Sequence, residues 1–247
     1  MKAIVMCGGF AKRLEPLSEF IAKPLLTLKG RPLLDYILQD LEKIEVIDEV
    51  VVSANQKFEN QFRYLAELKT RAGYKKKITL VIEPTSSNET KFGAIKGLNY
   101  AVEQAGINDG FFVVAGDNFY TFDIKSLFEE MAANKVPSIV SYDVKSLDSA
   151  KRFGVLKVGK DTYVESFEEK PEHPMSSLVS TGIYFYSKDV IKILRDYVDG
   201  KNNVDSMGNF VRYLTEKTKV KAFVQSSGNW VDIGTLDSYK RLFYEMQ

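Results

Sequence analysis

A cluster of small and basic residues near the start of the chain could bind phosphate. Gly8 and Gly9 separate an apolar run from Lys12 and Arg13 in the segment VMCGGFAKRLEPL, and Lys23 follows, beside a proline. Glycines let a ligand approach the backbone closely, and lysine and arginine side chains supply positive charge around it. The alternative is a strand-end turn followed by a solvated basic loop. A lysine held beside a rigid proline in an apolar segment favours the phosphate-binding interpretation.

The spacing of these residues excludes two common phosphate loops. The pattern G-x-x-x-x-G-K-[ST] is absent from the chain, and G-x-G-x-x-G does not follow the first apolar run. The pair Glu15 and Pro16 also disfavours a helix that starts at the glycines, because proline cannot donate an interior helical hydrogen bond. We therefore expect this loop to stay extended.

Composition limits the class of protein. The chain has 247 residues with 34 Lys and Arg against 33 Asp and Glu, so its net charge of +1 favours neither nucleic acid nor a membrane as a partner. Its single cysteine, Cys7, excludes an internal disulfide and a multi-thiolate metal site, and we expect it to be buried at a strand end. No apolar run reaches the roughly 18 residues that a membrane span needs. We expect a single-domain cytoplasmic protein, and a homo-oligomer is compatible with the sequence.

Strand-like and helix-like segments alternate through the first half of the chain. Apolar runs predict strands at 3–7, 49–54, 78–82, 111–115, 138–144, 154–158, 162–168, 179–186 and 219–225. Apolar residues with helical spacing predict helices at 33–44, 57–70, 92–105, 124–134, 188–198 and 204–217. The alternation predicts an α/β fold, a three-layer and mostly parallel mixed sheet with helices on both faces. After about residue 137 the strands come closer together and predict a β-rich insertion that carries the second half of a cleft.

Motifs along nearly the whole chain resemble those of the sugar-1-phosphate nucleotidylyltransferases, also called sugar nucleotide pyrophosphorylases. The segments CGGFAKRLEPLS and AKPLLTLKGRPLL are similar to the family forms G-G-x-G-T-R-L-x-P-L-T, P-K-P-L and G-K-P-L. Further motifs follow in the family's order: AGDN at 115–118, FGV at 153–155, EEKP at 168–171, STGIY at 180–184 and WVDIGT at 230–235. The resemblance implies a dinucleotide-binding-like nucleotidyltransferase fold with an inserted sugar-binding half.

The resemblance divides the single domain, 1–247, into a nucleotide-binding half at about 1–135 and a sugar-phosphate-binding half at about 136–230. We expect no C-terminal β-helix domain of the kind that some relatives append. Two departures from the family pattern stand out. Ala11 and Lys12 replace the signature's Gly-Thr, so the loop is expected to lose one backbone conformation and gain a charge. The segment before Gly93 lacks the first glycine of the usual G-[TL]-A motif.

The implied reaction is attack by the phosphate of a sugar-1-phosphate on the α-phosphorus of a nucleoside triphosphate, which displaces pyrophosphate. The second pKa of a phosphate monoester is about 6, so the nucleophile is already ionised at neutral pH and needs no general base. The reaction instead needs cations that suppress repulsion between two polyanions. His173, the single histidine, is therefore expected to be a surface residue.

The family roles carry over to individual residues. Arg13 would bind the β- and γ-phosphates, and Lys23 the α-phosphate or the attacking oxygen. Lys170 would hold the sugar phosphate beside Glu169, which would accept sugar hydroxyls. The alternatives are solvated cations and a surface ion pair. The implied nucleotide-binding set is Gly8, Gly9, Lys12, Glu83 and Gly93; the sugar-phosphate-binding set is Gly154, Glu169, Lys170 and Thr181, with loops 154–160 and 171–180 reading the sugar.

Two strand-end aspartates, Asp117 and Asp232, would converge on the phosphates and bind Mg²⁺, because carboxylate oxygens suit this ion. Either could instead be a turn residue or a helix cap, as we expect of Asp123. Glu83 would face the base with acceptors only, which suits the two adjacent donors of guanine and favours GTP. TTP, UTP and CTP are alternative nucleotides. Glu83 could also be a charged residue at a strand end that binds no ligand.

Two other functions remain open from the sequence. One is a cytidylyltransferase that acts on an alcohol phosphate or a sugar phosphate. The other is a non-catalytic homologue that binds a nucleotide sugar, which the altered Ala11 and Lys12 would favour.

Overall fold

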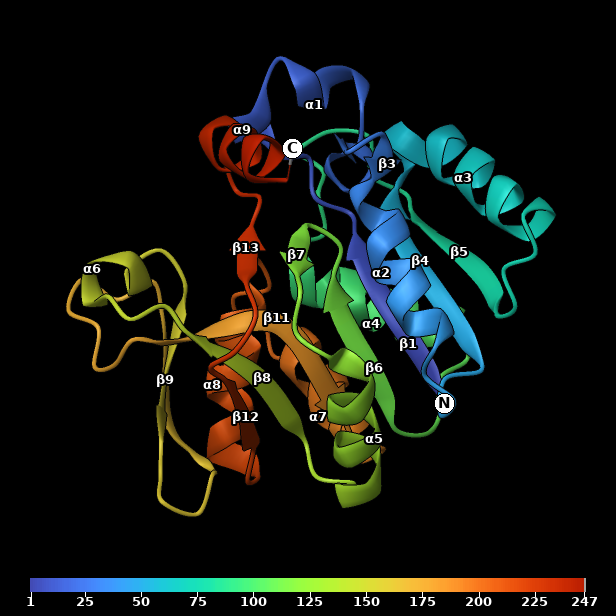
Figure 1. The fold of residues 1–247 in the computed structure, drawn as a ribbon. Coiled ribbons are helices and arrows are strands. Elements are labelled where there is room, and N and C mark those ends of the chain that lie inside the picture. The colour runs from blue at the N-terminus through green and yellow to red at the C-terminus, as the bar shows by residue number, and fades with distance from the viewer. Residues whose placement is uncertain (247) are drawn as a thin grey trace.

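A nine-stranded mixed sheet forms the centre of the molecule (Figure 1). The computed structural model describes residues 1–246. Strands run in the order β10-β9-β11-β6-β1-β4-β5, and β8 joins β11 to β12. The bounds are β1 (Lys2–Cys7), β4 (Glu49–Asn55), β5 (Lys77–Glu83), β6 (Phe111–Ala115), β8 (Ser138–Asp143), β9 (Gly154–Val158), β10 (Val164–Glu169), β11 (Leu178–Tyr186) and β12 (Lys221–Gln225).

The first half of the sheet is parallel and the second half is largely antiparallel. β1 pairs in parallel with β4 and β6, and β4 with β5. The direction changes at β11, which is antiparallel to β6, β8 and β9. The predicted α/β class with a mixed sheet is confirmed. The predicted β-rich second half corresponds to the strands from β8 onward.

Helices cover both faces of the sheet (Figure 1). One core contains α2 (Leu33–Glu42), α3 (Glu59–Arg71) and α5 (Ile124–Asn134), and the other contains α4 (Ala94–Gln104), α7 (Val190–Asp199) and α8 (Met207–Lys217). In β1, Ala3, Val5 and Cys7 belong to the first core, while Ile4 and Met6 contact the second. Burial on both faces explains why this strand is almost wholly apolar. The predicted strands and helices end within three residues of the observed ones.

Several short elements were not predicted. They are η1 (Lys12–Leu14), α1 (Leu17–Phe20), η2 (Lys23–Leu25), β2 (Thr27–Leu28), β3 (Arg31–Pro32), η3 (Gln56–Phe58), β7 (Asn118–Tyr120), α6 (Leu147–Ala150) and β13 (Trp230–Asp232). The last helix is α9 (Leu236–Glu245), which follows the WVDIGT motif. β7 and β13 form a separate antiparallel pair in which Asp232 lies opposite Asn118. This pair ties the end of the described chain to the end of β6.

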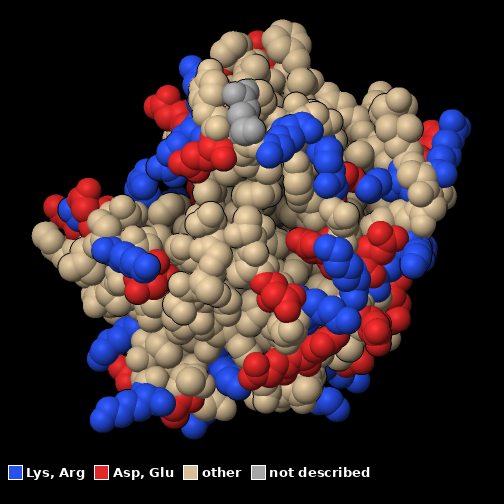
Figure 2. Space-filling model, in the orientation of Figure 1, with Lys and Arg blue, Asp and Glu red and all other residues tan. Residues whose placement is uncertain are grey.

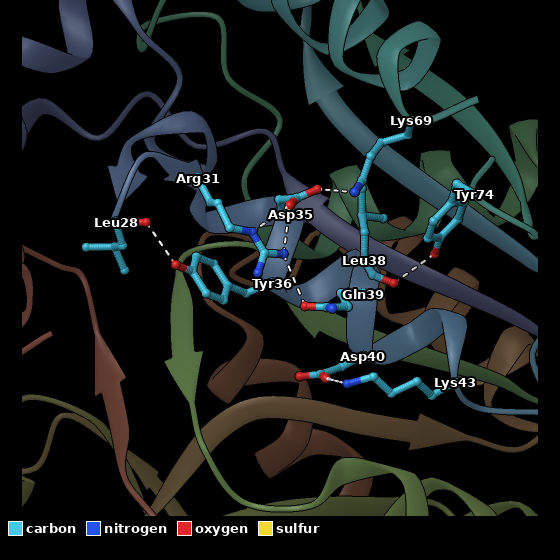
Figure 3. Close-up of polar contacts among 10 residues, drawn as sticks. All are labelled: Leu28, Arg31, Asp35, Tyr36, Leu38, Gln39, Asp40, Lys43, Lys69 and Tyr74. Carbon is cyan, nitrogen blue, oxygen red and sulfur yellow. Dashed lines mark hydrogen bonds and ion pairs between the residues drawn. The ribbon is translucent and has the colours of Figure 1, made fainter. Parts of the chain in front are cut away.

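Polar contacts fix α2 to its neighbours (Figure 3). Arg31 donates to Asp35 at 2.8 Å, Lys69 of α3 forms an ion pair with the same carboxylate, and the Tyr36 hydroxyl donates to the Leu28 carbonyl at 2.8 Å. Burial by itself would raise the pKa of Asp35, but hydrogen bonds from Lys69 and Arg31 outweigh it and lower that pKa. The β2–β3 hairpin, which follows the predicted phosphate-binding lysine, is thereby anchored.

Within the described residues, every helix is too short or too polar to cross a lipid bilayer.

Gly8 is needed for packing, not only for ligand approach. A Cβ on Gly8 would lie 2.9 Å from Cδ of Glu83, whereas a Cβ on Gly9 would have no atom within 4 Å. The Glu83 carboxyl has little room to move, because a Cβ on Gly97 would approach its Oε1 to 2.7 Å.

Gly8→Ala should therefore lower the free energy of unfolding by about 1–3 kcal/mol through overpacking. Gly9→Ala, the matched control, should change it by less than about 0.5 kcal/mol. Urea denaturation at neutral pH measures both. Equal losses in the two variants would show that the contact with Glu83 is not the cause.

Candidate active site

Three predicted site residues, the catalytic Lys23 and Asp117 and the metal-binding Asp232, meet at the carboxyl end of the parallel strands. Asp117 follows β6, and its Oδ2 lies 2.6 Å from Nζ of Lys23, which opens η2. The Lys23 side chain is 11% exposed, so its charge is largely removed from water. Asp232 reaches the same place from β13, and the amide of Ile233 donates to the Asp117 carbonyl at 3.1 Å. One cation and two carboxylates share this position.

The electrostatics of Asp232 link five of the predicted residues. Burial and, next in size, the negative charge of Asp117 together raise the pKa of Asp232 to about 6. Lys23, Lys170 and Arg13 act in the opposite direction. The side chains of these residues therefore lie close enough to influence the protonation of one carboxyl.

A cavity of about 450 Å³ opens beside Asp232. Arg13 and Lys170 line it, together with the aromatic rings of Phe153 and Trp230. Sequence reasoning missed other lining residues: Tyr142, Arg152 and Arg241. Arg152 directly precedes the FGV motif, and this position could have marked it as a candidate site residue. Arg241 lies on α9, beyond the last motif, where no motif marks it.

A second cavity, of about 360 Å³, lies on the other side of Asp117. Four residues of the predicted nucleotide-binding set line it: Gly8, Gly9, Glu83 and Gly93. Lys12 does not, because its Nζ points to Oε1 of Glu89 at 3.4 Å on the surface. Asn88, Lys91, Asp205 and Met207 also line this cavity, and no pattern in the sequence marked them.

Glu83 is buried at the inner end of the second cavity. It is 4% exposed, and Ser53 donates to its Oε1 at 3.2 Å. Burial raises the pKa of Glu83, and the Ser53 hydrogen bond only partly offsets this. The carboxyl predicted to face the base is thus held by burial and by the hydrogen bond from Ser53.

The predicted sugar-binding residues divide into two groups. Lys170 reaches the larger cavity, but Gly154, Glu169 and Thr181 line neither cavity. Thr181 is fully buried, and its hydroxyl donates to the Val140 carbonyl at 2.8 Å. The Thr181 carbonyl accepts from Asn118, which immediately follows Asp117. The hydroxyl of Thr181 is therefore used inside the sheet, and its carbonyl holds the side chain of Asn118.

The glycine-rich loop departs from two expectations. The loop does not stay extended beyond Ala11, because the amide of Leu14 donates to the Ala11 carbonyl at 2.8 Å and closes the η1 turn. Full burial of Leu14 explains why the chain turns there. Ala11 has φ 50° and ψ 42°, the left-handed conformation that glycine adopts easily. The expected loss of a backbone conformation at Ala11 is therefore wrong.

Three further expectations about single residues are confirmed. Cys7 is 2% exposed, and burial raises the pKa of its thiol well above the usual value. His173 is exposed. Asp123 caps α5 by accepting a hydrogen bond from the amide of Lys125.

The residues present fit a magnesium ion that is shared with a phosphate ligand. Among residues 1–246, no group of three or more His, Cys, Asp and Glu side chains could hold a metal. Mg²⁺ is commonly bound by one or two carboxylates with substrate phosphates completing its shell. The pair of Asp117 and Asp232 supplies this number of carboxylates, and burial together with the negative charge of Asp117 raises the pKa of Asp232.

The sequence model of the nucleotidyl transferase family matches residues 2–247. The chain belongs to this family, as the motifs predicted. It is similar to bifunctional protein GlmU of Methanocaldococcus jannaschii, with 25% identity over 95% of this chain and 51% of that protein. It is also similar to a putative mannose-1-phosphate guanyltransferase of Sulfolobus acidocaldarius, with 27% identity over 100% of this chain and 63% of that protein. The chain spans about half the length of the first of these relatives.

Solved structures share the fold over the whole chain. A putative glucose-1-phosphate thymidylyltransferase from Bacillus anthracis, in complex with a sucrose, superposes with a TM-score of 0.84 at 23% identity, covering 100% of this chain and 95% of that one. A UDP-glucose pyrophosphorylase complexed with UDP-glucose superposes with a TM-score of 0.81 at 18% identity, covering 99% and 97%. The predicted nucleotidyltransferase fold is confirmed.

The raised pKa of Asp232 predicts how stability depends on pH. The pKa is about 6 in the folded protein, against ~3.9 for an unfolded aspartate. Between these values the folded state binds more protons, so the contribution of Asp232 lowers the free energy of unfolding by about 2 kcal/mol as pH rises from about 4 to about 6.

Asp232→Asn should remove this decline, because an amide does not titrate. Urea denaturation from about pH 4 to about pH 7 measures the difference between variant and wild type. Asp196→Asn, on an exposed position of α7, should keep the wild-type profile. A decline in Asp232→Asn as steep as in the wild type would contradict the assignment.

Proposed function

We propose that this chain transfers a nucleoside monophosphate from a nucleoside triphosphate to a sugar-1-phosphate and releases pyrophosphate. The observation that carries this proposal is the cluster of Lys23, Asp117 and Asp232, in which Asp117 lines one cavity and Asp232 lines the other. One cavity has the glycine-rich loop and Glu83, and the other has Arg13 and Lys170. In this proposal the nucleotide is bound mainly by about 1–135 and the sugar phosphate by about 136–230.

The chain's own residues bind and orient two anions. Lys23 donates to the α-phosphate or the attacking oxygen, Arg13 binds the β- and γ-phosphates, and Lys170 holds the acceptor phosphate. The attacking phosphate is ionised at neutral pH, since its second pKa is about 6. No proton has to be removed, so a site without histidine is sufficient. Catalysis then comes from placement and from charge neutralisation in the transition state.

Asp117 and Asp232 would hold Mg²⁺ when substrates bind. The ion supplies positive charge to the α-phosphate and to the leaving pyrophosphate. Lys23 forms an ion pair with Asp117 at 2.6 Å, and binding of the ion would require Asp232 to lose any bound proton. Metal binding should therefore weaken as pH falls below the Asp232 pKa of about 6.

GTP is the favoured nucleotide. An ionised Glu83 offers acceptors only, which suits N1–H and N2–H of guanine and repels the carbonyls of thymine and uracil. Burial raises the pKa of Glu83. A protonated Glu83 would donate to a pyrimidine carbonyl, which makes TTP and UTP the alternatives; CTP could bind through its exocyclic amine.

A matrix of nucleoside triphosphates and sugar-1-phosphates tests the proposed reaction. Pyrophosphate release is measured with Mg²⁺ for GTP, TTP, UTP, CTP and ATP against glucose-, mannose-, galactose- and N-acetylglucosamine-1-phosphate, and phosphocholine is included as an alcohol phosphate. We expect turnover with at least one sugar phosphate and the highest kcat/KM with GTP. Ligand-induced stabilisation without turnover in any combination would refute an enzymatic function.

Removing either member of the central ion pair should slow turnover strongly. Lys23→Ala and Asp117→Ala should each lower kcat by at least about 10²-fold, the order found for loss of one electrostatic contact in a transition state. Lys192→Ala, which removes an exposed cation of α7, is the control and should keep the wild-type rate. Single-turnover kinetics separate this loss from weaker binding, and near-normal rates would exclude the proposed roles.

A further inference from the structure

The larger cavity carries more positive charge than the proposed reaction uses. Arg13, Arg152, Lys170 and Arg241 line it, against a single carboxylate, Asp232. The chain as a whole has a net charge of only +1, so this concentration is local. In Figure 2, Lys and Arg side chains gather beside α9, on the side of that helix that faces α6. Such a cavity attracts an anion.

These cations are poorly compensated by the protein. Among the described residues, Arg13 and Arg152 form no ion pair with a carboxylate, and Lys170 is paired only with its neighbour Glu169, at 3.5 Å. Arg241 lies 3.8 Å from Glu245, and both side chains are more than half exposed. Exposed pairs of this kind contribute little free energy. The guanidinium groups are therefore available to a ligand.

The surroundings of Arg152 favour a sugar. Its guanidinium lies 5.7 Å from the centre of the Phe153 ring, and that ring packs edge-on against Trp230 at 5.0 Å. Aromatic faces suit the C–H face of a sugar ring, and hydroxyls of Ser149, Thr235 and Ser238 also line the cavity. The backbone from Gly8 to Ala11, where a triphosphate would lie, borders the other cavity.

We propose that the acceptor is a sugar-1-phosphate that carries a second anionic group, a carboxylate or a phosphate, and that Arg152 and Arg241 bind this group. The inference rests on the proposed function, in which Lys170 holds the anomeric phosphate in the same cavity. Arg152 comes from the segment between α6 and β9, and Arg241 from α9, so the second anion is bound between two elements that approach from different sides. Planar guanidinium groups match both carboxylate and phosphate oxygens.

The test compares acceptors that share one sugar and differ in charge. Glucose-1-phosphate, glucose-1,6-bisphosphate and glucuronic acid 1-phosphate are titrated calorimetrically, and kcat/KM is measured with the best nucleotide; mannose-1-phosphate and mannose-1,6-bisphosphate form a second series. We expect an anionic acceptor to bind at least about 10-fold more tightly than its neutral counterpart, the size of one hydrogen bond to a charged group. Comparison of glucuronic acid 1-phosphate with glucose-1,6-bisphosphate shows whether a carboxylate or a phosphate is preferred.

Two variants and one control locate the effect. Arg152→Gln and Arg241→Gln should each reduce the preference for the anionic acceptor by about 10-fold and leave binding of the neutral acceptor unchanged. Lys240→Gln removes an exposed charge from the same helix outside the cavity and should keep the full preference.

Other outcomes would overturn the inference. A neutral acceptor that binds as tightly as both anionic acceptors would contradict the proposal that the acceptor carries a second anionic group. Variants that raise the KM for pyrophosphate in the reverse reaction, without affecting the acceptor, would assign the arginines to the leaving group. Turnover of neutral acceptors alone would overturn this inference and support the proposed function. Absence of any turnover, with Arg152-dependent binding of anionic sugars, would overturn the proposed function and keep the anion site.

Discussion

Two carboxylates and one ammonium group share a single partly buried space in this protein, and their charge balance governs the rest of the site. Lys23 neutralises Asp117 at 2.6 Å, which leaves Asp232 as the carboxyl whose pKa rises to about 6. Burying two ionised carboxylates beside one cation is unfavourable. Asp232 therefore holds its proton more tightly than an exposed aspartate does, and the proposed Mg²⁺ would supply the missing positive charge.

The fold is arranged to hold these three groups in place. Asp117 lies at the end of the central parallel strands, Lys23 opens a turn that the α2 contacts anchor, and Asp232 is fixed by the pairing of β13 with β7. Parallel strands bring their carboxyl ends to one edge, where α/β sheets bind ligands. Glycine at position 8 and a left-handed Ala11 then shape the loop that faces this edge. Asp117 lines one cavity and Asp232 lines the other, so that a ligand in either cavity lies beside the charged cluster.

The sequence was sufficient to predict the long helices and strands and to name the residues of the charged centre. The runs at 49–54 and 111–115 predicted β4 and β6 because strands buried on both faces are continuously apolar. β7 and β13 were not predicted, since three-residue strands have no periodicity. The burial of Glu83 and the internal hydrogen bond of Thr181 were also out of reach, because both depend on residues distant in sequence, such as Ser53 and Val140. Arg152 and Arg241 of the larger cavity were not predicted for the same reason, because they come from elements that are distant in sequence.

The pairing of β13 with β7 also separates the formation of the fold from the completion of the site. β13 contributes no strand to the nine-stranded sheet, and it joins a partner more than one hundred residues earlier in the chain. Contacts between such distant segments form slowly, because a long loop must close first. The nine-stranded sheet is thus complete without β13, whereas the charged centre needs Asp232 from that strand. Trp230, the single tryptophan of the chain, lies on β13 and packs against Tyr142 and Phe153, so that its fluorescence would report the docking of this segment on the second half of the sheet.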